Sequence, residues 1–251
     1  MTPVFERHGS GPVILMIHGL GGTANTWYAQ RRTLERDFTV VCPDLAGSGR
    51  SPAPGPLSID GFVADMLALL ETMPAGPVHL VGHSMGTIIC QHLAAQYPER
   101  ISSLALLGPL AEPPDASRKA LHARAALART EGMLPIAEAL LSASLSAETR
   151  AARPVVCAMV REILMRQPAE GYARTCEALA EARSADLAAI RCPTLLITGD
   201  EDGVGPPSHC REMARKMADA RLVVLTATGH WTPIERPTEV SQALLQHYFA
   251  L

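Results

Sequence analysis

Short apolar runs separated by stretches of helical periodicity constrain the fold of this chain more than any other feature of its sequence. The runs are rich in Val, Ile and Leu and scarcely alternate with polar residues, which is typical of strands covered on both faces in a parallel sheet. Between them, residues such as 59–70 place apolar side chains on one helical face, with Ser58 as a helix N-cap. This alternation predicts an α/β fold with a mostly parallel sheet. The predicted strands are residues 13–18, 39–44, 78–82, 104–108, 194–199 and 221–227.

The alternation of strands and helices stops between about residues 109 and 186, in a stretch rich in Ala, Arg, Leu and Glu. This stretch contains no convincing strand and predicts roughly four helices, with breaks near Gly132, Pro154 and Gly171. The simplest organisation is a single domain with a lid insertion. Its core is formed by residues 1–108 and 187–251, and its helical cap by residues 109–186.

Composition and charge exclude several classes of partner. The 251 residues are 47% hydrophobic, which is enough for one sizeable core. The net charge is −3 and no basic stripe is present, so we expect no nucleic-acid partner. No apolar leader or membrane-spanning run is present, so we expect no membrane partner. The six cysteines are scattered without zinc spacing, which favours free thiols, a cytoplasmic location and no metal. The sequence does not indicate an oligomeric state.

A serine flanked by glycines follows one of the predicted strands. The sequence Gly82-His83-Ser84-Met85-Gly86 matches the pattern G-x-S-x-G and precedes a predicted helix. The chain must turn sharply there, and the glycines allow the turn to expose the serine oxygen above the sheet edge. A helix N-cap serine is the simpler alternative, but it does not account for the partners that the rest of the chain supplies.

A base and an acid for Ser84 are predicted at the ends of two later strands. His230 follows residues 221–227 and a glycine, and strand-end loops are where α/β sheets hold their chemistry. Asp200, Glu201 and Asp202 follow residues 194–199. We favour Asp202 as the orienting acid, because Asp200 directly after the glycine is better placed to hold the turn. The resulting order Ser, Asp, His is that of an α/β-hydrolase triad.

The loop His18-Gly19-Leu20-Gly21-Gly22 is the predicted site for the negative charge of a tetrahedral intermediate. We expect the backbone amides of Leu20 and Met85 to donate to that oxyanion, with Met85 at a helix N-terminus. The same glycines formally match the dinucleotide fingerprint G-x-G-x-x-A, with Asp44 as its acidic residue. That alternative leaves Ser84 and its partners unexplained, so we expect no cofactor.

Together these segments resemble the α/β-hydrolase superfamily over the full length of the chain. The resemblance implies an eight-stranded sheet with a helical cap inserted after strand 6, and a catalytic triad of Ser84, Asp202 and His230. A serine nucleophile is unlike the aspartate of epoxide hydrolases and haloalkane dehalogenases. The matching segments are HGLGG (18–22), DLAGSGRS (44–51), GHSMG (82–86), GDEDGVGPP (199–207) and GHWTPIERP (229–237).

Within the superfamily the chain is most similar to 3-oxoadipate enol-lactonases and related small esterases, on the segment GYARTCEALAEARSADLAAIRCPTLLITGDED (171–202). The chain departs from the common pattern at Ala46, Ser48 and Thr87. The resemblance implies hydrolysis of a small carboxylic ester or (enol-)lactone through an acyl-enzyme. Three alternatives stay open: hydrolysis of a C–C bond in a vinylogous diketone, perhydrolase activity, and a ligand receptor without turnover.

Selectivity is expected to come from the cap. Trp27, Met133, Met159 and Trp231 are the residues that we expect to line the substrate pocket. The cap also carries many arginines, and one of them turned inward would bind a substrate carboxylate, as an enol-lactone of a diacid requires.

Overall fold

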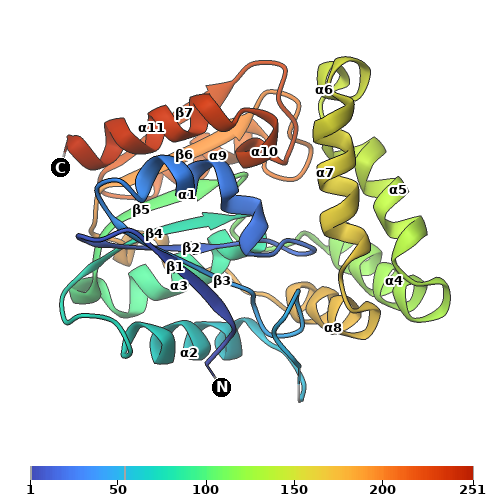
Figure 1. Ribbon diagram of the computed structural model, residues 1–251, viewed down its shortest axis with the longest axis horizontal. Helices are drawn as coiled ribbons and strands as arrows, with labels where there is room; N and C mark the ends of the chain where they lie inside the picture. The colour runs from blue at the N-terminus through green and yellow to red at the C-terminus, as the bar shows by residue number, and fades with distance from the viewer. Residues whose placement is uncertain (1, 54, 251) are drawn as a thin grey trace.

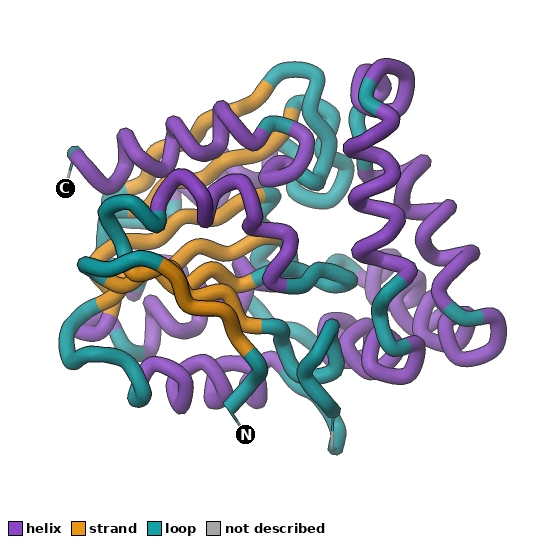
Figure 2. Tube along the Cα trace, viewed as in Figure 1, coloured by secondary structure: helices purple, strands orange, loops and turns teal. Residues whose placement is uncertain are grey.

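The strands of the protein form one mostly parallel sheet, as predicted (Figures 1 and 2). The computed structural model describes residues 2–53 and 55–250, and within them seven strands follow the order β1-β3-β2-β4-β5-β6-β7. Strand β1 runs antiparallel to β3, and every other neighbouring pair is parallel. The strands are β1 (Phe5–His8), β2 (Val13–Ile17), β3 (Thr39–Pro43), β4 (Val78–His83), β5 (Ile101–Leu107), β6 (Thr194–Gly199) and β7 (Ala220–Leu225).

The expected number of eight strands is wrong for the described part of the chain, and the cap therefore follows the fifth strand and not the sixth. The segment before β2 provides only β1, because Gly9 and Gly11 form a turn with φ angles of 76° and 111°. The sequence Phe5–His8 was missed as a strand because it is short and half polar.

Helices cover both faces of the sheet, which explains why the strands scarcely alternate in hydrophobicity. Ile14 and Met16 of β2 pack in one core layer with α1 and α11, whereas Leu15 and Ile17 pack in the other with α2 and α3. Each residue of β2 is therefore buried whichever way its side chain points. The helices of these layers are α1 (Tyr28–Leu34) and α11 (Pro237–Phe249) on one face, and α2 (Ile59–Leu70), α3 (Met85–Gln96) and α9 (Pro207–Arg215) on the other.

Five helices lie between β5 and β6 and form a group beside one end of the sheet (Figure 1). The break predicted near Gly171 lies a few residues earlier, between α7 and α8, and Gly171 itself is in the first turn of α8, where it packs so closely on Gly47 that any side chain would collide with the Gly47 carbonyl. That break is at Gln167 and Pro168, and a further break occurs at Leu145. The cap helices are α4 (Asp115–Glu131), α5 (Met133–Ser144), α6 (Ala147–Ala152), α7 (Pro154–Met165) and α8 (Ala169–Ala180).

Four shorter helical segments complete the fold: η1 (Ala24–Trp27), η2 (Pro98–Arg100), η3 (Leu187–Ala189) and α10 (Thr232–Glu235). Each helix in residues 2–53 and 55–250 is too short or too polar to span a bilayer.

Candidate active site

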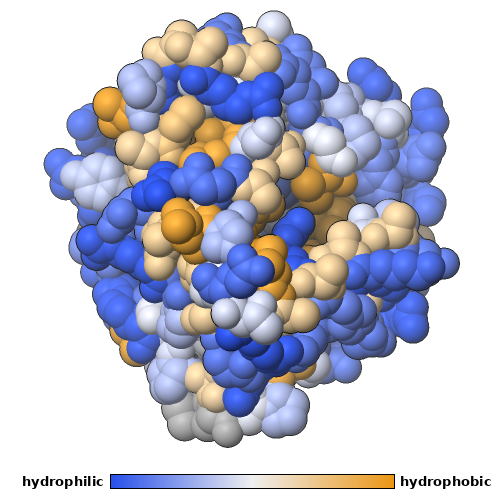
Figure 3. Space-filling model, turned by 90° about the vertical axis from the view of Figure 1, so that its right-hand side faces the viewer, coloured by the Kyte–Doolittle hydropathy of each residue, from blue (hydrophilic) through white to orange (hydrophobic). Residues whose placement is uncertain are grey.

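The loops after the parallel strands meet at one edge of the sheet, and a cavity of about 470 Å³ lies between them and the cap. Ser84, after β4, and His230, after β7, both line this cavity. Its remaining walls are mostly apolar and come from α4, α5 and α8 and from the segments before α4 and α9, which is typical of a site for a small organic molecule. Seen from the cap side, apolar surface lies in a recess bordered by polar residues (Figure 3).

Ser84 lies on a strained turn between β4 and α3. Its φ of 53° and ψ of −122° place a residue with a side chain in the left-handed region, which costs on the order of 1–3 kcal/mol and needs support from the surrounding structure. The Ser84 amide donates to Leu107 O at 2.9 Å, and Thr87 N donates to Ser84 O at 2.8 Å. A Cβ on Gly82 would lie only 2.6 Å from Gly86 O, so the turn requires this glycine. The sharp turn predicted from G-x-S-x-G is therefore present.

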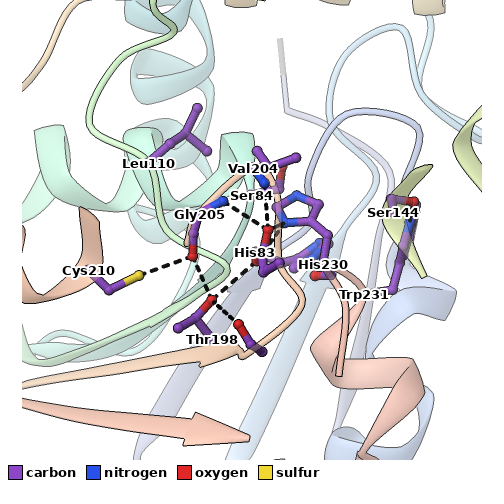
Figure 4. A network of polar contacts seen from close by, with 12 residues as sticks. His83, Ser84, Leu110, Ser144, Thr198, Val204, Gly205, Cys210, His230 and Trp231 are labelled. Carbon is purple, nitrogen blue, oxygen red and sulfur yellow. Dashed lines mark hydrogen bonds and ion pairs between the residues drawn. The ribbon is translucent and has the colours of Figure 1, made fainter. Parts of the chain in front are cut away.

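His230 and Asp202 form a buried contact. Nδ1 of His230 lies 3.0 Å from Oδ1 and 2.9 Å from Oδ2 of Asp202, whose side chain is fully buried. A carboxylate only accepts, so Nδ1 carries the proton and Nε2 is left as the free base. In Figure 4 the His230 ring lies next to Ser84, and both residues line the same cavity.

The surroundings of Asp202 keep it ionised. Burial alone raises the pKa of this carboxyl, but His230 and the amides of Gly205 and Val204 outweigh burial and hold the pKa well below its usual value. Those amides donate to Oδ1 at 2.9 and 2.8 Å. Asp200 instead accepts from Thr228 N at 3.2 Å and so holds the turn, as the sequence indicated. Asp202 is thus the acidic residue of this loop that contacts His230.

The loop after β2 lies against Ser84 and is held in place by a neutral histidine. Leu45 N donates to His18 Nε2 at 2.9 Å, so Nδ1 of His18 carries the proton and donates to Gly19 O at 2.8 Å. Burial lowers the pKa of His18, consistent with the neutral form. A Cβ on Gly19 would lie 2.7 Å from the Cβ of Ser84, which shows how closely the loop approaches the serine.

The two amides predicted to bind an oxyanion are free. Within the part of the chain that the structure describes, neither Leu20 N nor Met85 N donates to an acceptor. Leu20 lines the cavity, and Met85 is the first residue of α3, where the helix dipole adds partial positive charge. An oxygen bound there would meet two unpaired donors beside Ser84.

His83 supports the site as a buried neutral residue. Its Nε2–H donates to the backbone oxygen of His230 at 2.8 Å, and its ring lies 5.1 Å from the His230 ring and 5.4 Å from the Trp231 ring, between centroids. Burial and the neighbouring His230 lower the pKa of His83 to about 3. This histidine therefore packs against the site without carrying charge.

Of the residues expected to line the pocket, the structure places only Trp231 at the cavity. Trp27 is completely buried in the core layer of α1 and α11. Met133 packs into the other core layer, and Met159 faces a separate hollow beside Asn25. These three expectations were wrong because proximity to a catalytic loop in sequence, or apolar character in the cap, does not determine which side of a helix faces the site.

The cap contributes contacts that no sequence motif indicated. The carbonyl of Ser144, at the end of α5, accepts from His230 N at 2.7 Å, and its hydroxyl accepts from Trp231 Nε1 at 3.0 Å. Ser146 N donates to the buried Glu235 carboxylate at 3.0 Å. The loop that carries His230 is thus bonded directly to the α5–α6 connection.

Asp44, the acidic residue of the dinucleotide alternative, has other partners. Its Oδ1 accepts from Ala24 N at 2.7 Å, and its Oδ2 pairs with Arg50 Nε at 2.7 Å. Asp44 therefore joins two loops, and its carboxylate is not free to bind a ribose.

Comparison with known proteins shows sequence and structural similarity over almost the whole chain. A family model described as alpha/beta hydrolase fold matches residues 12–237. The 3-oxoadipate enol-lactonase 2 of Acinetobacter baylyi is 31% identical over 235 residues, which are 93% of this chain and 87% of that protein. The enol-lactonase of Burkholderia xenovorans has a TM-score of 0.92 at 32% identity, covering 98% of this chain and 96% of the other. A thermophilic esterase of Thermogutta terrifontis, solved with malate bound, has a TM-score of 0.92 at 31% identity, covering 97% and 91%.

Proposed function

Because the chain belongs to the alpha/beta hydrolase fold family and is a hydrolase, we propose that it cleaves a small carboxylic ester or lactone with Ser84 as nucleophile, His230 as base and Asp202 as the acid that orients the base. The observation that carries this proposal is the contact between Nδ1 of His230 and the Asp202 carboxylate, at 2.9 and 3.0 Å. The Asp202 contact leaves Nε2 unprotonated in the cavity that Ser84 lines.

The proposed reaction proceeds by two transfers of the acyl group. Ser84 Oγ attacks the carbonyl carbon while His230 Nε2 takes the hydroxyl proton, and the carbonyl electron pair moves to oxygen. The C–O bond to the leaving group then breaks, and His230 gives its proton to that alcohol or enol oxygen. Water attacks the acyl-enzyme while His230 Nε2 takes a proton from it, the Ser84 ester bond breaks to release the carboxylic acid, and His230 returns the proton to Ser84 Oγ. Asp202 stabilises the imidazolium at each stage.

The Leu20 and Met85 amides are the proposed donors to the oxyanion. Both are free of other acceptors, so they require no rearrangement before an oxygen binds, and loss of one such donor costs about 3 kcal/mol in the transition state. The sharp turn at Ser84 keeps its side chain on the cavity wall, which Leu20 also lines.

Small substrates are favoured by the cavity and by the relatives. A cavity volume of about 470 Å³ between the cap and the strand ends suits a compact ester or lactone better than an ester with a long acyl chain. Two of the similar proteins are enol-lactonases and one is an esterase. We infer that enol-lactones and short esters are the substrates to test first.

The test is a hydrolysis panel of short esters, lactones, enol-lactones and a vinylogous diketone, with Ser84→Ala as control. The proposal expects turnover of at least one of these classes in the wild-type protein and nearly complete loss in Ser84→Ala, since the three residues act as a unit. Wild-type turnover by Ser84→Ala would refute Ser84 as nucleophile. If the wild-type protein instead cleaved only vinylogous diketones, the bond that breaks would be C–C, and the ester proposal would be wrong.

A further inference from the structure

One buried side chain of the cap lies against the loop that carries Leu20. Gln167 is 5% exposed and lies just before Pro168, where the chain passes from α7 to α8 (Figure 1). It is not one of the residues that line the cavity of Ser84 in the described chain. Any effect of Gln167 on the reaction must therefore act through the residues that it contacts.

The Gln167 amide connects three segments of the protein. Its Nε2 lies 3.2 Å from Gly21 O, 3.3 Å from Gly22 O and 3.0 Å from Ile163 O, so two hydrogens are shared among three carbonyls. Its Oε1 accepts from Gly49 N at 3.3 Å. This side chain thereby bonds the cap both to the loop after β2 and to the loop after β3.

The cap packs closely on the loop after β2 on both sides of Gln167. A Cβ on Gly21 would lie 2.6 Å from Cδ2 of Leu164 in α7 and 3.2 Å from Cε2 of Tyr172 in α8. Gly21 has a φ of 76°, which a residue with a side chain adopts only with strain. The cap therefore determines where the Gly21 peptide can lie.

Two peptide groups connect the Gln167 amide to Leu20. Gly21 O accepts from Gln167 and shares its peptide with Gly22 N. That amide donates to Gly19 O at 3.0 Å, and Gly19 O shares its peptide with Leu20 N. In a planar trans peptide the C=O and N–H bonds point in opposite directions, so fixing each carbonyl fixes the N–H of the same group. The last N–H of this series belongs to Leu20, which lines the cavity.

Hydrogen bonds in such a series strengthen one another. Donation to a peptide oxygen polarises the whole amide group and makes its N–H a better donor. The series here begins at Gln167 and ends at the Leu20 N–H, which has no acceptor within the described chain. The His18 ring donates to Gly19 O at 2.8 Å and so holds the loop from the core side, while Gln167 holds it from the cap side.

We propose that Gln167 is a positioning residue for the oxyanion site, which holds and polarises the Leu20 N–H through the two peptides between them. This inference rests on the proposed function. An oxyanion donor is effective when it is oriented before the charge develops, and the Gln167 contacts supply that orientation from the cap. Loss of the Gln167 donor should weaken the Leu20 hydrogen bond to the oxyanion and leave the contact between His230 and Asp202 unchanged.

The experiment compares two esters that differ only in the atom that becomes the oxyanion, p-nitrophenyl acetate and O-p-nitrophenyl thionoacetate. Sulfur is a weak hydrogen-bond acceptor, so the thionoester gains little from the amide donors. The measured quantity is the ratio of kcat/KM for the oxoester to kcat/KM for the thionoester, divided by the same ratio of rates for hydrolysis by hydroxide. We expect this normalised ratio to be about 100 or more in the wild type and to fall about 10-fold in Gln167→Met, which is part of the cost of losing one donor.

Two substitutions of Gln167 test the same contact. Gln167→Met keeps nearly the length and volume of the side chain and removes its hydrogen bonds. Gln167→Glu keeps the acceptor for Gly49 N, but it places a carboxylate oxygen against the Gly21 carbonyl, so its normalised ratio should fall at least as far. Thermal unfolding reports whether each variant is folded, and if Gln167→Met does not fold, Gln167→Glu decides the question.

Arg174→Met is the matched control for loss of a bond between cap and core. Arg174 belongs to α8 and donates to Ala53 O at 3.0 Å and to Gly55 O at 3.3 Å. It pairs with Glu170 and does not contact the loop after β2 in the described chain. Arg174→Met should therefore keep the normalised ratio of the wild type, since its effects fall on both esters alike.

Two outcomes overturn the proposal. One is a folded Gln167 variant whose normalised ratio equals that of the wild type, including a variant that loses activity toward both esters equally. The other is a wild-type protein whose ratio equals that of hydroxide, because its amides then do not stabilise the oxyanion. Either result leaves Ser84 as the proposed nucleophile, since p-nitrophenyl acetate is still cleaved and Ser84→Ala abolishes that cleavage. Failure of the proposed function is different: the wild type hydrolyses neither ester.

Discussion

Asp202→Asn keeps the shape of the contact with His230 but reverses the direction of its hydrogen bond, because an amide NH₂ donates where a carboxylate oxygen accepts. Oδ1 of Asp202 accepts from the amides of Val204 and Gly205 at 2.8 and 2.9 Å. In the variant only the amide oxygen can take that position, because an NH₂ group cannot accept a hydrogen bond. The NH₂ must then lie where Oδ2 lies, 2.9 Å from Nδ1 of His230, and donate to it. The amide oxygen at the Oδ1 position lies 3.0 Å from Nδ1, slightly farther than the NH₂ group, so donation from the NH₂ favours the tautomer with the imidazole proton on Nε2, in which the base facing Ser84 is lost.

The magnitude of this change follows from the loss of the correct tautomer. We expect kcat to fall by about 10⁴-fold, or about 5 kcal/mol of transition-state stabilisation. The fold should survive, since the two backbone amides keep their acceptor. The assay is steady-state hydrolysis of the best ester from the panel, with Ser84→Ala defining the background and thermal unfolding reporting the fold.

Asp200→Asn is the matched control for this experiment. Asp200 lies on the same loop, accepts from Thr228 N, and does not contact His230, so its variant should keep a kcat close to that of the wild type. If Asp202→Asn kept more than about a tenth of the wild-type kcat with an unchanged melting temperature, the tautomer argument would be wrong.

Three further changes probe the surroundings of the site. Gly108→Ala puts a Cβ 2.9 Å from Nδ1 of His230 on a residue with φ of 54°, so kcat should fall by more than about 10-fold, and wild-type kinetics would contradict this geometry. Ser144→Ala leaves the buried Nε1–H of Trp231 without its acceptor at 3.0 Å, which should lower the free energy of unfolding by about 1–3 kcal/mol in chemical denaturation. The variant should also lower kcat more than it changes KM. Ser144→Thr should restore both the stability and kcat. Burial, Arg221 and His79 lower the pKa of His247 from 6.5 to about 4. As pH falls, this histidine is therefore protonated in the unfolded chain before it is protonated in the folded protein, and stability is lost between about pH 6.5 and about pH 4. His247→Gln should flatten that decline in denaturant titrations.

The parallel sheet could be predicted from sequence because burial on both faces leaves a direct mark. Ile14 and Leu15 are adjacent in the chain and are buried in opposite layers, and only a doubly covered strand permits such a run. Strand β1 leaves no comparable mark, since Phe5–His8 is a short edge strand with mixed polarity. The break predicted near Gly171 falls a few residues earlier for a related reason: the glycine packs closely against Gly47 inside a helix, and a sequence pattern does not distinguish that use from a helix end.

The contact between His230 and Asp202 was predictable because parallel topology brings strand ends to one edge, and because the residue next to Gly199 was expected to hold the turn. The cavity wall was not predictable in the same way. Ser144, Arg124 and Tyr172 come from different cap helices, and their approach to the site depends on how those helices pack. Trp27 illustrates the opposite error, since it is near the site in sequence and buried away from the cavity.

The central claim is that Ser84 is a nucleophile activated by His230, and the most direct measurement is the mass of the intact protein after treatment with a fluorophosphonate. The account predicts one covalent adduct per chain, located on Ser84 by peptide mapping, with loss of ester hydrolysis in proportion to the adduct formed. Ser84→Ala should gain no adduct, and His230→Ala should react far more slowly. An unmodified wild-type protein, or an adduct at another residue that accompanies the loss of hydrolysis, would contradict the account.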